Sequence, residues 1–270
     1  MKQTPSKRSY LLLAGILLAA ILIAVLTSSK PTAASDRATA AELQAGRSYL
    51  EALSRKDPAL VDAALKERDE AKRARDRADL LDELCQDEAN VWSLFDNYVL
   101  MGEALGSGFS VYGFFSEDRV LAGSSYTLRN VATSLDKAAA LKPEVVFLCF
   151  GLNDLNSGNW PTPDSYAQAM VEAVTLVRQR IPGVTVVVSS ILPVQEKALR
   201  ICQKWAEIPA YNEALEKACR KNSIEFANVS RLAAEHQDLW ESDGYHLRSG
   251  FYRYWACSLI VPVEVPAYDN

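Results

Sequence analysis

The sequence predicts an α/β protein in which helices cover both faces of a parallel β-sheet. Three observations lead to this prediction. From residue 97 onward, short apolar segments alternate with amphipathic segments of helical period. The apolar segments are continuous, which is typical of strands buried on both faces. Apolar residues also make up 49% of the 270 residues, which is enough for a sizeable core.

Five segments have the length and composition of buried strands: 98–101, 119–122, 145–150, 184–189 and 224–229. Helices are expected between and after them, at 104 onward, over 128–141, over 162–181, over 211–219 and after residue 248. Thr162-Pro163 is a capping residue followed by a first-turn proline, which marks a helix start. In sheets of this kind, sites form beyond the carboxyl ends of the strands. Functional residues are therefore expected directly after the strands.

The N-terminus has the composition of a membrane signal. Lys2, Lys7 and Arg8 precede an uncharged apolar stretch over residues 10–26. This stretch is longer than the apolar part of a cleaved signal peptide and slightly short for a spanning helix. We favour an uncleaved anchor over a cleaved signal, which would release a secreted protein. By the positive-inside rule the N-terminus is cytoplasmic, and both alternatives place the rest of the chain outside.

Between the anchor and the α/β region the composition is helical. Residues 41–90 are rich in alanine, leucine, glutamate and arginine, and Asp57-Pro58 predicts a helix start there. Residues 66–79 are charged on every face, which favours a solvated stalk over a coiled-coil dimer, because no heptad repeat persists. The sequence thus divides into a leader and anchor (1–27), a linker and helical stalk (28–90) and an α/β domain (91–270).

Charge and cysteine usage exclude some classes of function. The net charge is −5 with both signs interspersed, so neither a nucleic-acid partner nor a polybasic membrane patch is indicated. The five cysteines are widely spaced and form no CxxC motif, so no zinc or redox motif is supported. No metal is expected. Whether Cys202 pairs with Cys219 is left open.

Two segments place candidate residues at strand ends. In "NYVLMGEALGSGF" a strand leads through a tight glycine turn into a helix, where a hydrolase would display a nucleophilic serine. The turn here runs from Gly102 to Leu105, and Ala104 has no nucleophile. In "VVFLCFGLNDLNSG" a buried strand leads into a turn from Gly151 to Asp154. The side-chain amide of Asn153 in this turn can donate to an oxyanion.

The third segment, "SDGYHL", contains one of the two histidines of the chain. Asp243 lies three residues before His246, close enough for its carboxylate to reach the imidazole. Such a bond fixes the ring tautomer and stabilises the imidazolium of a general base. Taken alone, this segment and the Asn153 segment are also what ordinary turns look like. Their order along the chain gives them their meaning.

The chain contains three blocks in a fixed order: strand-Gly-x-x, then strand-Gly-x-Asn-Asp, then Asp-x-x-His near the C-terminus. This order resembles the block pattern of the SGNH/GDSL hydrolases. The resemblance covers residues 91–262 and includes "VWSLFDNYVLMG", "KPEVVFLCFGLNDL", "TVVVSSILPV" and "DGYHLRSGFYRYWA". It implies a flavodoxin-like three-layer α/β/α sandwich and hydrolysis of ester or acyl bonds, with no cofactor.

The resemblance also implies roles for individual residues. His246 matches the general base of the family and Asp243 the carboxylate that orients it, and Asn153 matches an oxyanion donor. The backbone N–H of Gly123 is the best match for a second donor, although Ser124 and Ser125 are neighbours with which it is easily misaligned. Four further positions are expected to contact substrate: Gly102, Glu103, Gly151 and Asp154.

The first block departs from the family pattern. The family has Gly-Asp-Ser-Leu, whereas this chain has Gly102-Glu103-Ala104-Leu105, so the serine position is Ala104 and the aspartate before it is Glu103. Three explanations stay open. The chain is a pseudoenzyme that binds an acylated ligand or a partner, a nearby serine replaces the nucleophile, or the serine was lost by a strain-specific or engineered change.

Ser107 is the best substitute nucleophile because it lies one helical turn beyond Ala104; Ser110, Ser124 and Ser125 are weaker candidates. Loss of the nucleophile in a serine protease lowers turnover by about 10⁶, which favours the pseudoenzyme. Retention of the Asn, Asp and His positions favours the active alternative, an extracytoplasmic esterase acting on cell-wall or surface polysaccharide. The expected partners are the membrane, through the N-terminal helix, and an acylated small molecule or glycan.

Overall fold

The computed structural model describes residues 42–48, 51, 57–87 and 90–268. Its contacts divide the chain into two compact units, Met1–Lys66 and Glu67–Asn270, and the candidate site lies in the second. The predicted anchor over residues 10–26 lies outside the described residues. Within the described ranges, no helix is both long enough and apolar enough to cross a membrane.

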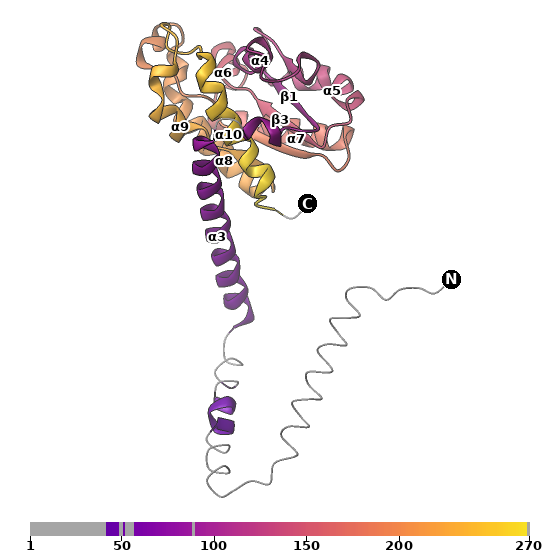
Figure 1. The fold of residues 1–270 in the computed structure, drawn as a ribbon, viewed down its shortest axis with the longest axis vertical. Helices are drawn as coiled ribbons and strands as arrows, with labels where there is room; N and C mark the ends of the chain where they lie inside the picture. Colours follow the sequence, from indigo (N-terminus) through magenta and orange to yellow (C-terminus); the bar gives the residue numbers. More distant parts are fainter. Residues whose placement is uncertain (1–41, 49–50, 52–56, 88–89, 269–270) are drawn as a thin grey trace, which may run out of the picture. The chain divides into compact units, whose positions relative to one another are not determined.

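Five parallel strands form one sheet in the order β2-β1-β3-β4-β5 (Figure 1). They are β1 (Tyr98–Gly102), β2 (Val120–Ala122), β3 (Val145–Cys149), β4 (Thr185–Ser189) and β5 (Glu225–Ala227). This is the strand order of flavodoxin-like doubly wound sheets. The predicted parallel sheet is confirmed, with each strand inside or within one residue of its expected segment.

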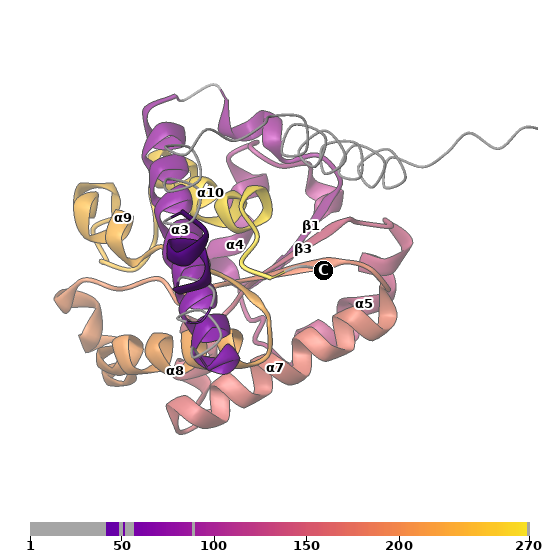
Figure 2. The same cartoon turned by 90° about the horizontal axis from the view of Figure 1, so that it is seen from below.

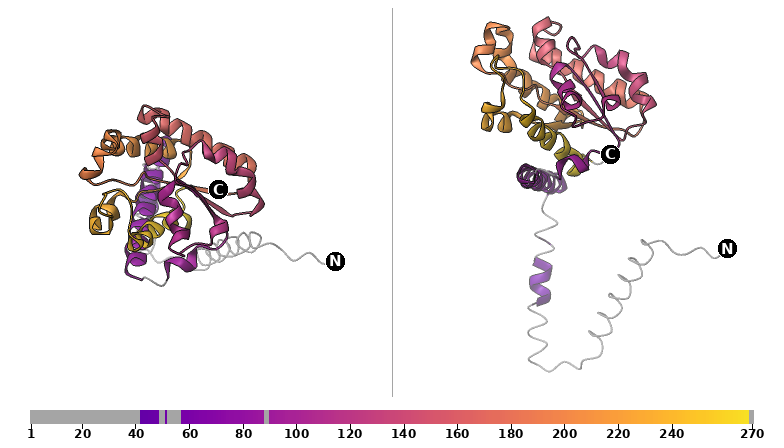
Figure 3. Two further views of the ribbon diagram at one scale, coloured as in Figure 1. Left: turned by 90° about the horizontal axis from the view of Figure 1, so that it is seen from above. Right: turned by 45° about the horizontal axis from the view of Figure 1, so that its top comes forward.

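Helices cover the two faces of this sheet (Figures 2 and 3). On one face lie α4 (Ala104–Val111) and α10 (Ser249–Glu264); on the other lie α5 (Asn130–Ala140), α7 (Pro163–Arg180) and α8 (Ile208–Lys221). Two short helices that the sequence does not predict are α6 (Leu152–Ser157) and α9 (Ser230–Glu235). Short 3₁₀ segments span Val91–Leu94, Glu117–Arg119, Glu196–Arg200, Gln203–Glu207 and Gln237–Leu239.

The central strands are buried on both faces, which explains their continuous apolar sequence. Val99, Val146 and Val187 have no exposed surface. At the carboxyl end of β1, a Cβ atom on Gly102 would lie 2.8 Å from the carbonyl oxygen of Cys149 in β3. Only glycine allows these two strand ends to approach so closely, and this approach brings the turns that follow them together.

Sequence signals at two helix starts are confirmed. Thr162 forms a capping box with Ser165 at the start of α7. Helix α3 (Pro58–Gln86) begins where Asp57 accepts a hydrogen bond of 3.0 Å from the backbone N–H of Ala59. These local signals require only neighbouring residues, so the sequence is sufficient to find them.

The part of α3 from residue 67 onward packs within the second compact unit. Leu84 is 2% exposed. The guanidinium of Arg77 forms an ion pair with the buried carboxylate of Glu225 in β5. Glu225 also accepts hydrogen bonds from the backbone N–H groups of Ala267 and Tyr268. The second compact unit begins at residue 67 and includes this part of α3. The division between stalk and α/β domain at residue 90 stays a prediction.

These contacts predict different outcomes for two truncations. A chain starting at residue 67 should unfold cooperatively with nearly the native free energy of unfolding. A chain starting at residue 91 leaves Glu225 buried without its cation, which should lower the free energy of unfolding by about 3 kcal/mol or more. Urea denaturation of both chains measures the difference. Glu225→Gln in the shorter chain should recover part of the loss, and equal midpoints for the two chains would contradict this account.

Candidate active site

Three segments carry most of the predicted site residues. The turn after β1 leads into α4, the turn after β3 leads into α6, and a loop between α9 and α10 holds Asp243 and His246. Gly151, between β3 and α6, has φ of +146°, and a Cβ atom there would lie 2.4 Å from the side chain of Ile191. Position 151 therefore requires glycine, because any side chain would clash and the backbone angle is strained for other residues.

The carboxylate of Glu103 joins the first segment to the second. Oε1 accepts a hydrogen bond of 2.9 Å from the backbone N–H of Leu152, and Oε2 accepts one of 2.5 Å from Asn153. These N–H groups belong to the first turn of α6, which attracts negative charge. Glu103 is 5% exposed. Burial raises the pKa of Glu103 to about 8 against these two bonds, and the nearby Asp154 carboxyl adds to the rise.

Asp154 is a second buried carboxyl beside Glu103, with 1% of its surface exposed. Oδ1 accepts a hydrogen bond of 2.9 Å from the backbone N–H of Leu128, while Oδ2 is buried and has no partner among the described residues. Burial raises the pKa of Asp154 to about 7, against the Leu128 bond and the charge of Arg129. Both acids of this pair therefore change charge near neutral pH.

Asp243 and His246 are hydrogen-bonded side chain to side chain. Oδ2 of Asp243 lies 2.7 Å from Nδ1 of His246, and Oδ1 accepts from the backbone N–H groups of Tyr245 and His246. Burial alone would raise the pKa of Asp243, but these bonds hold it below its ordinary value. The His246 side chain is 47% exposed. With Nδ1 donating to the carboxylate, Nε2 has the free lone pair of a general base.

Asn153 has both amide hydrogens engaged. Its Nδ2 donates to the carbonyl oxygens of Ser124 and Tyr126, at 3.0 and 2.8 Å. The amide thus holds the loop after β2 against the start of α6. An amide group offers two hydrogens, so in this conformation Asn153 has none left for an oxyanion.

Ala104 is the first residue of α4 and is half-buried. Ser107, one turn later, donates its hydroxyl to the carbonyl oxygen of Ala104 at 2.5 Å. Ser110 repeats the pattern, donating to the carbonyl of Ser107 at 3.0 Å. Among the hydrogen bonds of the described residues, none joins a serine hydroxyl to Nε2 of His246. A nucleophilic role for Ser107 stays a prediction, and it would require the hydroxyl to leave this bond.

The other predicted site residues are half-buried or buried. Gly123 is half-buried, and a Cβ atom there would lie 3.0 Å from the ring of Tyr126, so its donor role stays a prediction. The four positions expected to contact substrate are all buried: Gly102, Glu103, Gly151 and Asp154. Their burial and their bonds to neighbouring backbone favour a structural role over direct substrate contact.

Aromatic residues that the sequence does not single out connect the three segments. The indole N–H of Trp205 donates to the carbonyl of Leu152 at 3.0 Å, and the Trp205 ring lies 5.2 Å from the ring of Tyr245. Tyr245 in turn lies 4.1 Å from the His246 ring. The Tyr252 hydroxyl donates to the carbonyl of Leu105, beside Ala104, at 2.9 Å. Of these aromatic residues, only Tyr245 could have been found from the sequence, because it directly precedes His246.

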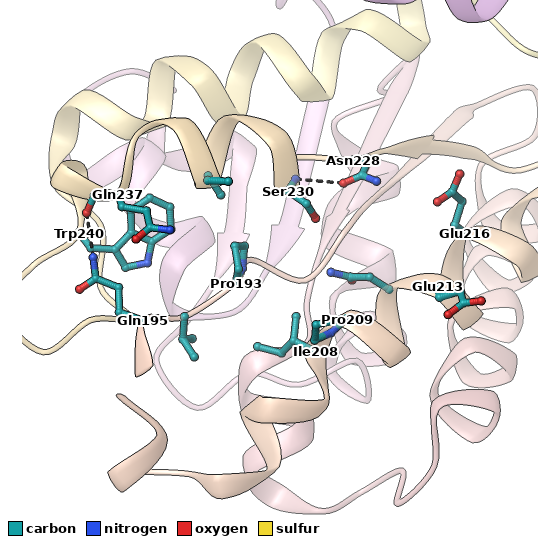
Figure 4. A pocket seen from close by; sticks show the side chains of 14 residues that line it. Pro193, Gln195, Ile208, Pro209, Glu213, Glu216, Asn228, Ser230, Gln237 and Trp240 are labelled. Carbon is teal, nitrogen blue, oxygen red and sulfur yellow. Dashed lines mark hydrogen bonds between the residues drawn. The ribbon is translucent and has the colours of Figure 1, made fainter. Parts of the chain in front are cut away.

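A cavity of about 410 Å³ lies on the β4–β5 side of these segments (Figure 4). Pro193, Ile208, Asn228 and Trp240 are among its lining residues, and none of the predicted site residues lines it. The cavity meets the histidine loop at Gln195, whose backbone N–H donates to the carbonyl of Gly244 at 2.8 Å. It is therefore adjacent to the candidate site but separate from it. Within the described ranges, no group of histidine, cysteine, aspartate or glutamate side chains is arranged to hold a metal ion.

The strand order and the segments at its carboxyl edge define an α/β protein with its candidate site at the strand ends. A family model, that of the GDSL-like Lipase/Acylhydrolase family, matches residues 100–254, which is more than half of the chain. The chain belongs to this family. A search of curated protein sequences returned no match.

Two solved structures illustrate the similarity. A Bacteroides fragilis protein assigned as an acylhydrolase is 18% identical with a TM-score of 0.51, and the match covers 62% of this chain and 87% of the other. A Parabacteroides merdae protein assigned as a GDSL-like lipase is 12% identical with a TM-score of 0.52, covering 62% and 95%. At these identities the similarity supports the fold alone.

The buried carboxyl pair predicts that stability falls as pH rises. The folded pKa of Asp154 is raised to about 7, so the folded chain holds a proton that the unfolded chain releases at pH values above the ordinary 3.8. The free energy of unfolding should decrease between about pH 4 and about pH 7, by roughly 1.4 kcal/mol for each unit of raised pKa, and Glu103 should extend the decrease to about pH 8.

Asp154→Asn keeps an oxygen for the Leu128 N–H and removes the titration. Melting curves between about pH 5 and about pH 9 should therefore be flatter for this variant than for the native chain. Asp238→Asn, which changes an exposed carboxylate, is the matched control and should keep the native slope. An unchanged slope in Asp154→Asn would mean that Asp154 is already ionised throughout this range.

Proposed function

We propose that this chain is an acylhydrolase-fold binding protein that recognises an acylated ligand beside His246 without cleaving it. The observation that supports the proposal is Ala104 at the start of α4, the residue that the sequence resemblance matches to the family's serine. The Asp243 carboxylate and the His246 imidazole are hydrogen-bonded, with Oδ2 at 2.7 Å from Nδ1. Within the described residues, however, no nucleophile is hydrogen-bonded to the histidine.

The state of Asn153 supports this proposal over residual catalysis. An oxyanion donor must be aimed at the developing charge before the reaction, because preorganisation is the source of its effect. Here the amide hydrogens of Asn153 are directed at the carbonyls of Ser124 and Tyr126. A ligand at this position would first have to break these two bonds.

The alternative is an active ester hydrolase that uses Ser107. The hydrogen-bonded Asp243 and His246 favour it, because a binding protein does not need an ionised aspartate to orient a histidine. The hydroxyl of Ser107 is a weak point of this alternative, since it donates back to the carbonyl of Ala104. A hydroxyl in this arrangement satisfies its own helix and is not activated.

We also propose that the domain is displayed outside the membrane, held by the apolar stretch over residues 10–26. The basic leader formed by Lys2, Lys7 and Arg8 supports this orientation. At this location an acylated glycan or small molecule is the ligand class that fits both the family and the placement of the domain.

Calorimetry with an O-acetylated polysaccharide and with the same polysaccharide after chemical deacetylation tests this ligand class. Binding only to the acetylated form, weakened by His246→Ala, is expected.

An ester-hydrolysis assay separates the two functions. The native chain should hydrolyse p-nitrophenyl acetate no faster than its His246→Ala variant. The double variant Glu103→Asp with Ala104→Ser supplies a serine for the existing Asp243 and His246. Because loss of a nucleophile costs about 10⁶ in turnover, recovery of even a small part should raise the rate at least about 100-fold over the native chain. Adding His246→Ala to the double variant should abolish the gain.

The displaced nucleophile has its own test within the same assay. Ser107→Ala should leave the native rate unchanged, and Ser110→Ala is the matched control because its hydroxyl makes the same kind of bond one turn later. A native rate well above background that Ser107→Ala removes and Ser110→Ala retains would overturn the binding proposal in favour of the hydrolase.

A further inference from the structure

Two cysteines from distant parts of the chain lie where the end of α3 is bonded to α10. Cys85 lies in the last turn of α3 and is half-buried, and Cys257 lies in α10 and is buried. Each of these two thiols is the largest influence on the pKa of the other. Both residues belong to the compact unit Glu67–Asn270. The other three cysteines, Cys149, Cys202 and Cys219, are buried.

The backbone around this thiol pair is held in place. Arg253, one helical turn before Cys257, donates from Nη2 to the carbonyl oxygens of Leu84 and Cys85, at 3.3 and 2.6 Å. Leu84 is 2% exposed and packs in the core. The end of α3 is thus fixed on α10 by one buried side chain and two hydrogen bonds. The backbone of Cys85 therefore lies against α10, one helical turn from Cys257.

Charge around the pair makes the two thiols unequal. The hydrogen bond from Cys257 lowers the pKa of Cys85, burial opposes this, Arg253 and Arg231 lower it further, and Asp82 raises it. For Cys257 the same bond and its burial raise the pKa. The more exposed Cys85 is therefore the thiol that ionises first, and the thiolate is the nucleophile in disulfide exchange.

We propose that Cys85 and Cys257 are a disulfide-forming pair that locks the end of α3 onto α10. The oxidant is a small-molecule or protein disulfide. The Cys85 thiolate attacks one sulfur of that disulfide, which forms a mixed disulfide and releases one thiolate. Cys257 then loses its proton to solvent and attacks Sγ of Cys85, which releases the second thiolate. The protein loses two hydrogens, and the oxidant is reduced to two thiols.

The bond would close a loop of about 170 residues, and cross-links that close long loops restrict the unfolded chain most. It would also connect α3, the helix that follows the N-terminal segment, covalently to the helix that follows the His246 loop. This pairing differs from the one left open by the sequence, Cys202 with Cys219. Spacing alone has no means of identifying partners so far apart.

The test uses the full-length chain, reduced and then equilibrated with glutathione disulfide under native conditions. Intact mass should fall by two hydrogens without a retained glutathione, and peptide mapping should join the peptides of Cys85 and Cys257. The melting temperature should rise by about 10 °C on oxidation. Cys85→Ser should abolish both changes, whereas Cys202→Ser, the control, should retain both.

Two results would overturn the proposal. One is a stable glutathione adduct on Cys85 with Cys257 still reduced, because it would show that the second thiol cannot reach the first. The other is a disulfide that maps to different cysteines. Cys257→Ser tests the second step, since it should trap the glutathione adduct on Cys85. If the buried substitution prevents folding, Cys85→Ser and the peptide map of the native chain still decide the matter.

Discussion

The arrangement of the candidate site depends on one buried carboxylate. Glu103, at the end of β1, bonds the first two N–H groups of α6, which follows β3. Without such a partner, the start of α6 would leave donors unpaired, and of the bonds among the described residues only the backbone bond from Glu103 to Cys149 would join the two turns. The close approach of Gly102 to Cys149 puts this carboxylate within reach. Position 103 is therefore constrained by folding, whether or not the neighbouring residue performs chemistry.

This constraint clarifies the departure from the family pattern. By the resemblance described above, this chain has the longer glutamate followed by alanine where the family has an aspartate followed by serine. A glutamate that is 5% exposed and bonded to two backbone donors serves the fold. Retention of an acid at position 103 thus requires no catalytic explanation. Asp243 also accepts hydrogen bonds from two backbone N–H groups, so the exposed imidazole of His246 is the part of the site that most favours a ligand.

Much of the fold was predictable because its signals are local. Buried parallel strands leave continuous apolar runs, and the Thr162 cap and Asp57-Pro58 mark helix starts within three residues. Asp243 and His246 lie three apart, so their bond was predictable as well. Helix α6 was not, because glycine, asparagine and aspartate indicate a turn, and Glu103, from another strand, is what satisfies its first N–H groups. The bonds of Asn153 and the contact of Trp205 with Tyr245 also join distant segments, which spacing does not show.

The occupied amide of Asn153 sets how the cleft would respond to a ligand over time. Because both amide hydrogens are engaged with the carbonyls of Ser124 and Tyr126, this amide can donate a hydrogen bond to a ligand only in a second conformer in which one of these bonds is broken. The apparent affinity of any ligand that uses this amide is reduced by the fraction of chains in the open form. Association of such a ligand would then be limited by the rate of loop opening and would saturate with ligand concentration, so the β2–α5 loop would control the kinetics of binding.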